Sequence, residues 1–170
     1  MKTGKYLMLI AAFSLFFFLV PCSFLSARDT SPGFFIAPLA EVSGYGREGL
    51  GYGGGLTLGM GDGVSIGFRL LYTGETGEER INALELAIFI RFYPFSSNVP
   101  IGLFFQIESG AVIISPNGES AISSEKKGSF VAGIAVGWRF PFGSRWYIEP
   151  AIRAGYPFIA GAGVSIGFRL

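Results

Sequence analysis

The chain has 170 residues, enough for one domain. Half of the residues are hydrophobic and only 15% are charged, whereas the surface of a soluble domain is about 25–35% charged. This hydrophobicity, with a formal net charge of +1, excludes a disordered chain. The low net charge also provides no basic field for nucleic acid, so we expect no nucleic-acid partner.

The first segment has the pattern of a secretory signal peptide. Lysines precede an apolar run over residues 6–20, and small residues follow that run. We therefore expect residues 1–27 to be a signal peptide and residues 28–170 to form the mature domain. A retained membrane anchor and a lipid-modified Cys22 are the alternatives.

The mature domain would contain neither cysteine nor histidine, because Cys22 is the single cysteine and the sequence has no histidine. A disulfide within the domain is then excluded. So are a catalytic histidine triad and a zinc site built from histidine and cysteine. We predict no catalytic residue, no metal site and no cofactor.

Beyond residue 27, apolar and polar or small residues alternate with a period of two, which predicts β-strands. The octapeptide GVSIGFRL, present at residues 63–70 and again at 163–170, shows the pattern most clearly. Its Val, Ile, Phe and Leu share one face of the strand, and its Ser, Gly and Arg share the other. The predicted strands are residues 34–42, 52–60, 64–73, 84–92, 101–108, 130–140, 146–156 and 164–170.

These strands have about nine to eleven residues, the length that crosses a bilayer at a tilt. The connections between them alternate in length, as in outer-membrane barrels. The short connections are residues 61–63, 94–100 and 141–145. The longer connections, which hold most of the remaining charge, are residues 43–49, 74–80 and 114–128.

The alternation alone is also compatible with a soluble barrel or sandwich that encloses its apolar face. The polar phase, however, is rich in Gly, Ala and Ser and contains no lysine or aspartate. Small side chains suit the narrow lumen of an eight-stranded barrel, which cannot hold all the bulky residues of the apolar phase. We therefore predict an all-β, eight-stranded antiparallel up-and-down transmembrane barrel with its apolar face toward lipid.

The charged residues of the predicted strands all lie in the phase of small residues. An arginine at the lipid-facing midplane costs about 2–4 kcal/mol, so we expect these residues to face the lumen and pair there. A network that plugs the lumen is the first interpretation, and an ion-conducting path or a catalytic carboxylate pair are the alternatives. The residues are Glu41, Arg69, Glu85, Arg91, Glu108, Arg139, Glu149, Arg153 and Arg169.

The hairpin turns predict which of these charges meet. A fold centred near residue 77 sets Arg69 opposite Glu85, and the next hairpin brings Glu108 close to Glu85. Arg69 is therefore expected to bridge two carboxylates. A fold centred near residue 159 sets Glu149 opposite Arg169.

Aromatic residues collect near the strand ends, which predicts two girdles at the membrane interfaces. The expected girdle at the end with short turns contains Phe92, Tyr93, Phe95, Phe140, Phe142, Trp146 and Phe168. The expected girdle at the end with long loops contains Tyr45, Tyr72, Phe130, Tyr156 and Phe158. Pro38 and Pro150 fall inside strands, and we expect a β-bulge at each.

The pattern as a whole resembles the small eight-stranded outer-membrane barrels of the OmpA-barrel, OmpX and OmpW group. The resemblance covers the mature chain, although these proteins typically end in an aromatic residue and this chain ends in Leu170. It implies a monomeric outer-membrane protein of a diderm bacterium, in contact with outer-membrane lipid and inserted by the barrel assembly machinery. Roles in this group include surface adhesion, envelope integrity and, in the OmpW branch, passage of small hydrophobic molecules.

Three functions follow as hypotheses. The first is a structural or surface-interaction barrel that binds an extracellular ligand through the long loop 114–128. The second is a narrow channel for small ions or small hydrophobic solutes. An outer-membrane enzyme is the third, and the missing histidine argues against it. The loop residues expected at the surface are Asn117, Glu119, Glu125, Lys126 and Lys127.

Overall fold

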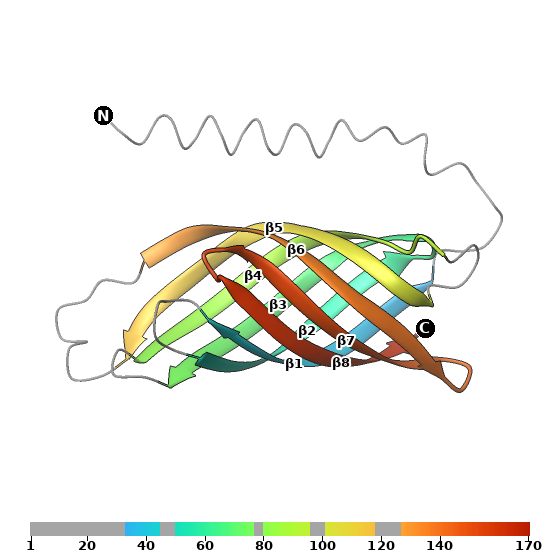
Figure 1. Ribbon diagram of the computed structural model, residues 1–170, viewed down its shortest axis with the longest axis horizontal. Coiled ribbons are helices and arrows are strands. Elements are labelled where there is room, and N and C mark those ends of the chain that lie inside the picture. The colour runs from blue at the N-terminus through green and yellow to red at the C-terminus, as the bar shows by residue number, and fades with distance from the viewer. Residues whose placement is uncertain (1–32, 45–49, 77–79, 96–100, 118–126) are drawn as a thin grey trace, which may run out of the picture. The chain divides into compact units, whose positions relative to one another are not determined.

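The computed structural model describes residues 33–44, 50–76, 80–95, 101–117 and 127–170. Within these ranges, eight antiparallel strands form a closed barrel in which each strand pairs with the next and β8 pairs with β1 (Figure 1). The strands are β1 (Phe34–Gly44), β2 (Leu50–Gly61), β3 (Val64–Thr76), β4 (Arg80–Phe92), β5 (Gly102–Asn117), β6 (Lys127–Phe142), β7 (Trp146–Tyr156) and β8 (Ala160–Arg169).

The predicted fold class, an eight-stranded antiparallel up-and-down barrel, is confirmed. We call the end with the β2–β3, β4–β5 and β6–β7 connections the turn end, and the opposite end the loop end. A search of the described residues finds no helix long and apolar enough to span a membrane. The predicted signal peptide, Tyr45 and the loop residues Glu119, Glu125 and Lys126 lie outside the described residues.

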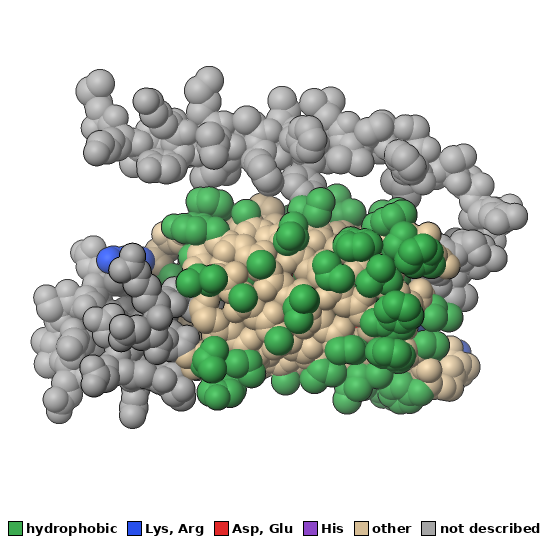
Figure 2. All heavy atoms as spheres, in the orientation of Figure 1, with side chains coloured by type: hydrophobic (Ala, Val, Ile, Leu, Met, Phe, Trp, Pro, Cys, Tyr) green, Lys and Arg blue, Asp and Glu red, His purple; other side chains and the backbone are tan. Residues whose placement is uncertain are grey.

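Side chains alternate between the outside and the lumen along each strand, as the period of two predicts. In β4, the Leu86 side chain is 55% exposed on the outside, while its neighbours Glu85 and Ala87 are 0% and 1% exposed inside. On the face that Figure 2 shows, hydrophobic side chains are spread over the barrel wall and are densest at the turn end. The barrel is therefore apolar outside and encloses its charges.

The structure corrects the length of the β5–β6 connection. Both strands have 16 residues, and Ile114 of β5 pairs with Lys127 of β6. The connection is therefore residues 118–126 rather than 114–128, because strand pairing continues into the predicted loop. Asn117 ends β5, and Lys127 begins β6 with its side chain exposed.

The prediction of β-bulges at the two prolines is wrong. β1 pairs with β8 in a single register on both sides of Pro38, and β6 pairs with β7 in a single register on both sides of Pro150. A bulge would insert one residue and shift the register. Each proline instead interrupts the pairing with one neighbouring strand, on the side where the missing N–H removes a ladder hydrogen bond.

The repeated octapeptide meets the same packing requirement in β3 and in β8. In both copies the second glycine faces the lumen beside an aromatic ring of the next or preceding strand. A Cβ on Gly67 would lie 2.6 Å from Cζ of Phe89, and a Cβ on Gly167 would overlap the ring of Tyr147. Glycine is thus required at both positions, because the neighbouring ring occupies the space of a side chain.

We predict that Gly167→Ala lowers the free energy of unfolding by about 1–3 kcal/mol, the usual cost of overpacking a filled interior. Gly128→Ala is the matched control, because nothing lies within 4 Å of the added Cβ. Urea unfolding in lipid vesicles, followed by tryptophan fluorescence, measures both effects. Equal stability of the two variants would contradict this account of the repeat.

Candidate functional site

The lumen is filled by charged side chains that the strands project inward. Arg169 lies nearer the mouth of the barrel and is partly exposed. Each of the other predicted lumen charges is at most 7% exposed. These buried residues are Glu41, Arg69, Glu85, Arg91, Glu108, Arg139, Glu149 and Arg153. They form two groups, described in turn below.

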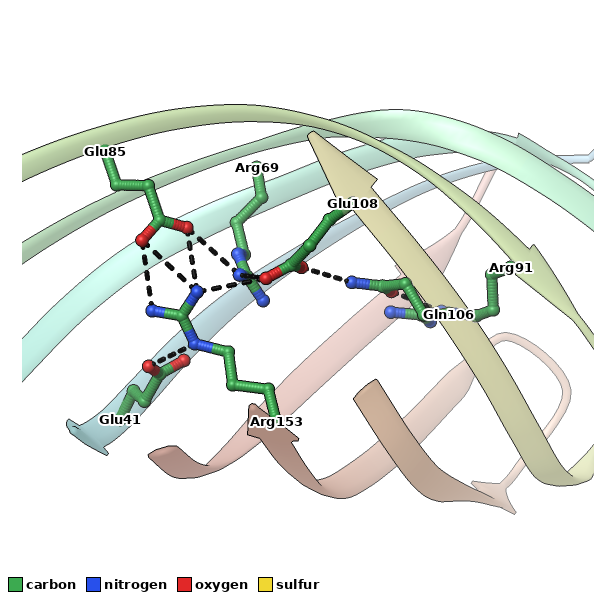
Figure 3. A network of polar contacts seen from close by, with 7 residues as sticks. All are labelled: Glu41, Arg69, Glu85, Arg91, Gln106, Glu108 and Arg153. Atoms are coloured by element: carbon green, nitrogen blue, oxygen red, sulfur yellow. Dashed lines mark hydrogen bonds and ion pairs between the residues drawn. The ribbon is translucent and has the colours of Figure 1, made fainter. Parts of the chain in front are cut away.

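The first group, the central cluster, consists of Glu41, Arg69, Glu85, Glu108 and Arg153. Arg69 Nη2 lies 3.0 Å from Glu85 Oε1 and 2.5 Å from Glu108 Oε1. Arg153 donates from Nε to Glu41 Oε1 at 2.6 Å, and its terminal nitrogens reach the other two carboxylates at 2.9–3.2 Å. Two guanidinium groups are therefore held by three carboxylates (Figure 3).

The second group, the turn-end cluster, places two arginines around one carboxylate. Arg91 Nη1 donates to both oxygens of Glu149 at 2.9 Å, and Arg139 Nε donates to Glu149 Oε1 at 2.5 Å. Arg139 lies over the ring of Tyr147, 3.9 Å from its centroid, and Arg91 lies 4.2 Å from the centroid of Phe104. The two guanidinium groups of this cluster share one carboxylate, and the aromatic faces stabilise them further.

Gln106 joins the two clusters. Its carbonyl oxygen accepts a hydrogen bond from Arg91 Nε at 2.9 Å, and its Nε2 donates to Glu108 Oε2 at 2.9 Å. The amide provides both a donor and an acceptor without adding charge. Together the clusters contain four arginines and four glutamates, so the buried charges balance.

Gln106 is absent from the sequence prediction of the site, although one signal pointed to it. It is a long polar side chain in a phase otherwise rich in small residues, two positions before Glu108. Tyr93 also joins the turn-end cluster, since its hydroxyl donates to Glu149 Oε1 at 3.3 Å.

The predicted contact between Arg169 and Glu149 is not formed. Ser165, rather than Arg169, pairs with Glu149 across β7 and β8, because the hairpin is centred two residues earlier than predicted. Arg169 instead forms an ion pair with Asp62 of the β2–β3 turn. This pair, about a quarter exposed, lies at the turn end of the lumen.

Arg69 lies opposite Ala87 in the strand register and not opposite Glu85. The difference of two residues leaves the ion pair intact, because the arginine side chain is long enough to span it. Arg69 therefore contacts both Glu85 and Glu108 as described above.

The aromatic girdles are partly as predicted. Phe130 stacks on Tyr156 with a centroid distance of 4.8 Å at the loop end, and Trp146 packs on Phe168 at 4.9 Å at the turn end. The prediction is wrong for Tyr93 and Phe158, which are 1% and 0% exposed inside the lumen. Phe158 lies two residues beyond the last paired residue of β7, where alternation no longer predicts direction. Tyr93 follows Phe92 directly and continues the inward phase of Arg91. The remaining described girdle residues lie on the outer surface: Tyr72, Phe92, Phe95, Phe140 and Phe142.

A small cavity lies between the two clusters. It has a volume of about 50 Å³ and is lined by Thr57, Arg69, Arg91, Gln106 and Ser165, among others. Such a volume admits a few water molecules but no larger solute. In the part of the chain that the structure describes, no group of three or more His, Cys, Asp or Glu side chains is arranged to hold a metal ion. The arrangement is suited to closing the lumen and fixing the barrel's shape.

This geometry defines the fold class of the small eight-stranded outer-membrane barrels. The N-terminal barrel domain of Pseudomonas aeruginosa OprF is similar, with 18% identity, a TM-score of 0.50, and coverage of 80% of this chain and 97% of that one. Neisserial surface protein A is also similar, with 12% identity, a TM-score of 0.57, and coverage of 81% and 96%. No protein-family model and no curated protein sequence matches the chain. At these identities the likeness shows a shared fold.

Proposed function

We propose that the chain is an integral outer-membrane protein of a diderm bacterium, with a closed lumen and a structural or surface-interaction role. One observation carries this proposal: bulky apolar side chains cover the outside, while balanced charges fill the inside. Phe68, Ile134 and Ile152 of the outer wall are 56%, 60% and 65% exposed. A continuous apolar wall of this kind is unstable in water and matches the hydrocarbon of a bilayer.

The projecting β5–β6 hairpin supports a role at the cell surface. Pairing of β6 with β7 begins only at Ala132 and Tyr156, so the first residues of β6 extend beyond the β7–β8 connection. Figure 1 shows β5 and β6 reaching past that connection at the loop end. Two of the predicted contact residues, Asn117 and Lys127, are the strand residues at the loop end of this hairpin. The other three, Glu119, Glu125 and Lys126, belong to the connection 118–126, outside the described residues.

Replacing residues 118–126 by a Gly-Ser linker of equal length tests the surface role. We expect the barrel to keep its heat-modifiable migration, while cells that display it lose adhesion to a surface coated with extracellular-matrix protein. The same replacement of residues 45–49 is the control and should leave adhesion unchanged. Unchanged adhesion after the first replacement would reject the contact role of the β5–β6 hairpin.

The charged lumen also motivates the second candidate, a narrow channel. We predict that the refolded wild-type barrel produces no unitary conductance in planar bilayers, because the two clusters and their aromatic neighbours fill the described part of the lumen around a cavity of about 50 Å³. A channel-forming outer-membrane porin recorded in the same bilayers is the control. Reproducible conductance steps from this barrel would instead favour the channel.

A further inference from the structure

Phe158, in the connection between β7 and β8, folds into the lumen at the loop end. Its side chain is fully buried and packs in a cluster with Ala83, Val112 and Val131, against which Ile114 also lies. These partners come from β4, β5 and β6, so the ring contacts the neighbouring strand β6 and reaches across the lumen as far as β4. The cluster lies at the loop end of the central cluster and contains no charged group.

The neighbouring strands provide a close-fitting seat for this ring. A Cβ on Gly133 or on Gly155 would lie 2.9 Å from Cζ of Phe158, so both positions have room only for glycine. On its other side the ring faces Arg153, whose Cζ lies 3.7 Å from the ring centroid. The connection is also tied to the end of β1, because the Ile159 N–H donates to the Gly44 carbonyl at 2.9 Å.

We propose that Phe158 is a stopper that closes the loop end of the lumen independently of the closure at the turn end. The turn-end closure is made by Phe35, Tyr93, Phe104 and Tyr147 around the two arginines of the turn-end cluster. The two closures act in series, with the central cluster between them. The short β7–β8 connection therefore controls access to the buried charges from the loop end.

Thiol labelling in proteoliposomes tests the stopper. Val112→Cys, in a Cys22→Ser background, places one thiol in the cluster beneath Phe158, and a small cationic methanethiosulfonate reagent reports its exposure. We expect Phe158→Ala to accelerate labelling by about tenfold or more, because a buried thiol is inert until solvent reaches it. Phe130→Ala removes an outward-facing ring at the same end and should leave the labelling rate unchanged.

Two further measurements make the outcome decisive. Phe158→Leu keeps an apolar side chain in the seat, so it should fold even if the alanine variant does not, and a smaller acceleration is expected. Planar-bilayer recording of Phe158→Ala should show no conductance, because the turn-end closure remains. Slow labelling in a folded Phe158→Ala barrel, or equally fast labelling with Phe158 present, would overturn the stopper. Conductance from Phe158→Ala alone would overturn the closures in series.

Discussion

Replacing Arg153 by leucine is expected to lower the free energy of unfolding by about 3–5 kcal/mol, the usual cost of removing one partner from a buried ion pair. Arg153 contacts Glu41, Glu85 and Glu108 together. Without it, three buried carboxylates of the central cluster face a single guanidinium, that of Arg69. Urea unfolding in vesicles, followed by the fluorescence of the two tryptophans, measures the loss.

Two variants separate this effect from a general loss of positive charge. Arg145→Leu removes an exposed arginine of the β6–β7 turn and should change stability by no more than about 0.5 kcal/mol. Arg153→Lys keeps the charge but lacks the planar guanidinium group that reaches three carboxylates. Its loss of unfolding free energy should therefore lie between those of Arg145→Leu and Arg153→Leu. If Arg153→Leu unfolds at the same urea concentration as Arg145→Leu, the central cluster does not stabilise the barrel.

Placing an arginine on the outer wall is expected to lower the free energy of unfolding nearly as much as Arg153→Leu does. Leu86→Arg puts a charge in the middle of β4 on the outward face, where the wild-type side chain is 55% exposed. In a bilayer this position faces hydrocarbon, so we expect a loss of about 2–4 kcal/mol in the same unfolding measurement. In a water-soluble barrel the same exposed position would accept arginine with little change.

The depth dependence provides the control for this variant. Val64→Arg places the same charge outward at the turn end of β3, near the interface, and should cost only about 0–1 kcal/mol. Leu86→Ala measures the contribution of the lost side chain alone. Equal stability of Leu86→Arg and Leu86→Ala would contradict a lipid-facing wall.

The strand pattern and the direction of each face could be predicted from the sequence because alternation is a local property. In β4, for example, Glu85 and Leu86 point to opposite sides whatever their partners are. The exact strand register could not be predicted, because it depends on the geometry of the turns, which the alternation of residues does not determine. The predicted contact of Arg169 with Glu149 is therefore wrong, and Arg169 pairs with Asp62.

The lumen also contains contacts that only the closed barrel creates. Phe158 follows the end of β7, where the period of two stops, and turns inward instead of joining a girdle. Tyr93 keeps the inward phase of Arg91 and donates to Glu149 of β7. These contacts depend on distances across the lumen, which the order of residues along one strand does not reveal.

Quenching of tryptophan fluorescence by brominated lipid tests most directly which face of the wall meets the bilayer. Two single-tryptophan barrels, Ile88→Trp and Phe89→Trp, are built in a background in which Trp138 and Trp146 are replaced by phenylalanine. The two positions are adjacent in β4, and their side chains are 49% and 0% exposed. Strong quenching at position 88 with weak quenching at position 89 is the predicted result. The reverse pattern would mean that the apolar face of the wall is enclosed and that this barrel does not span a membrane.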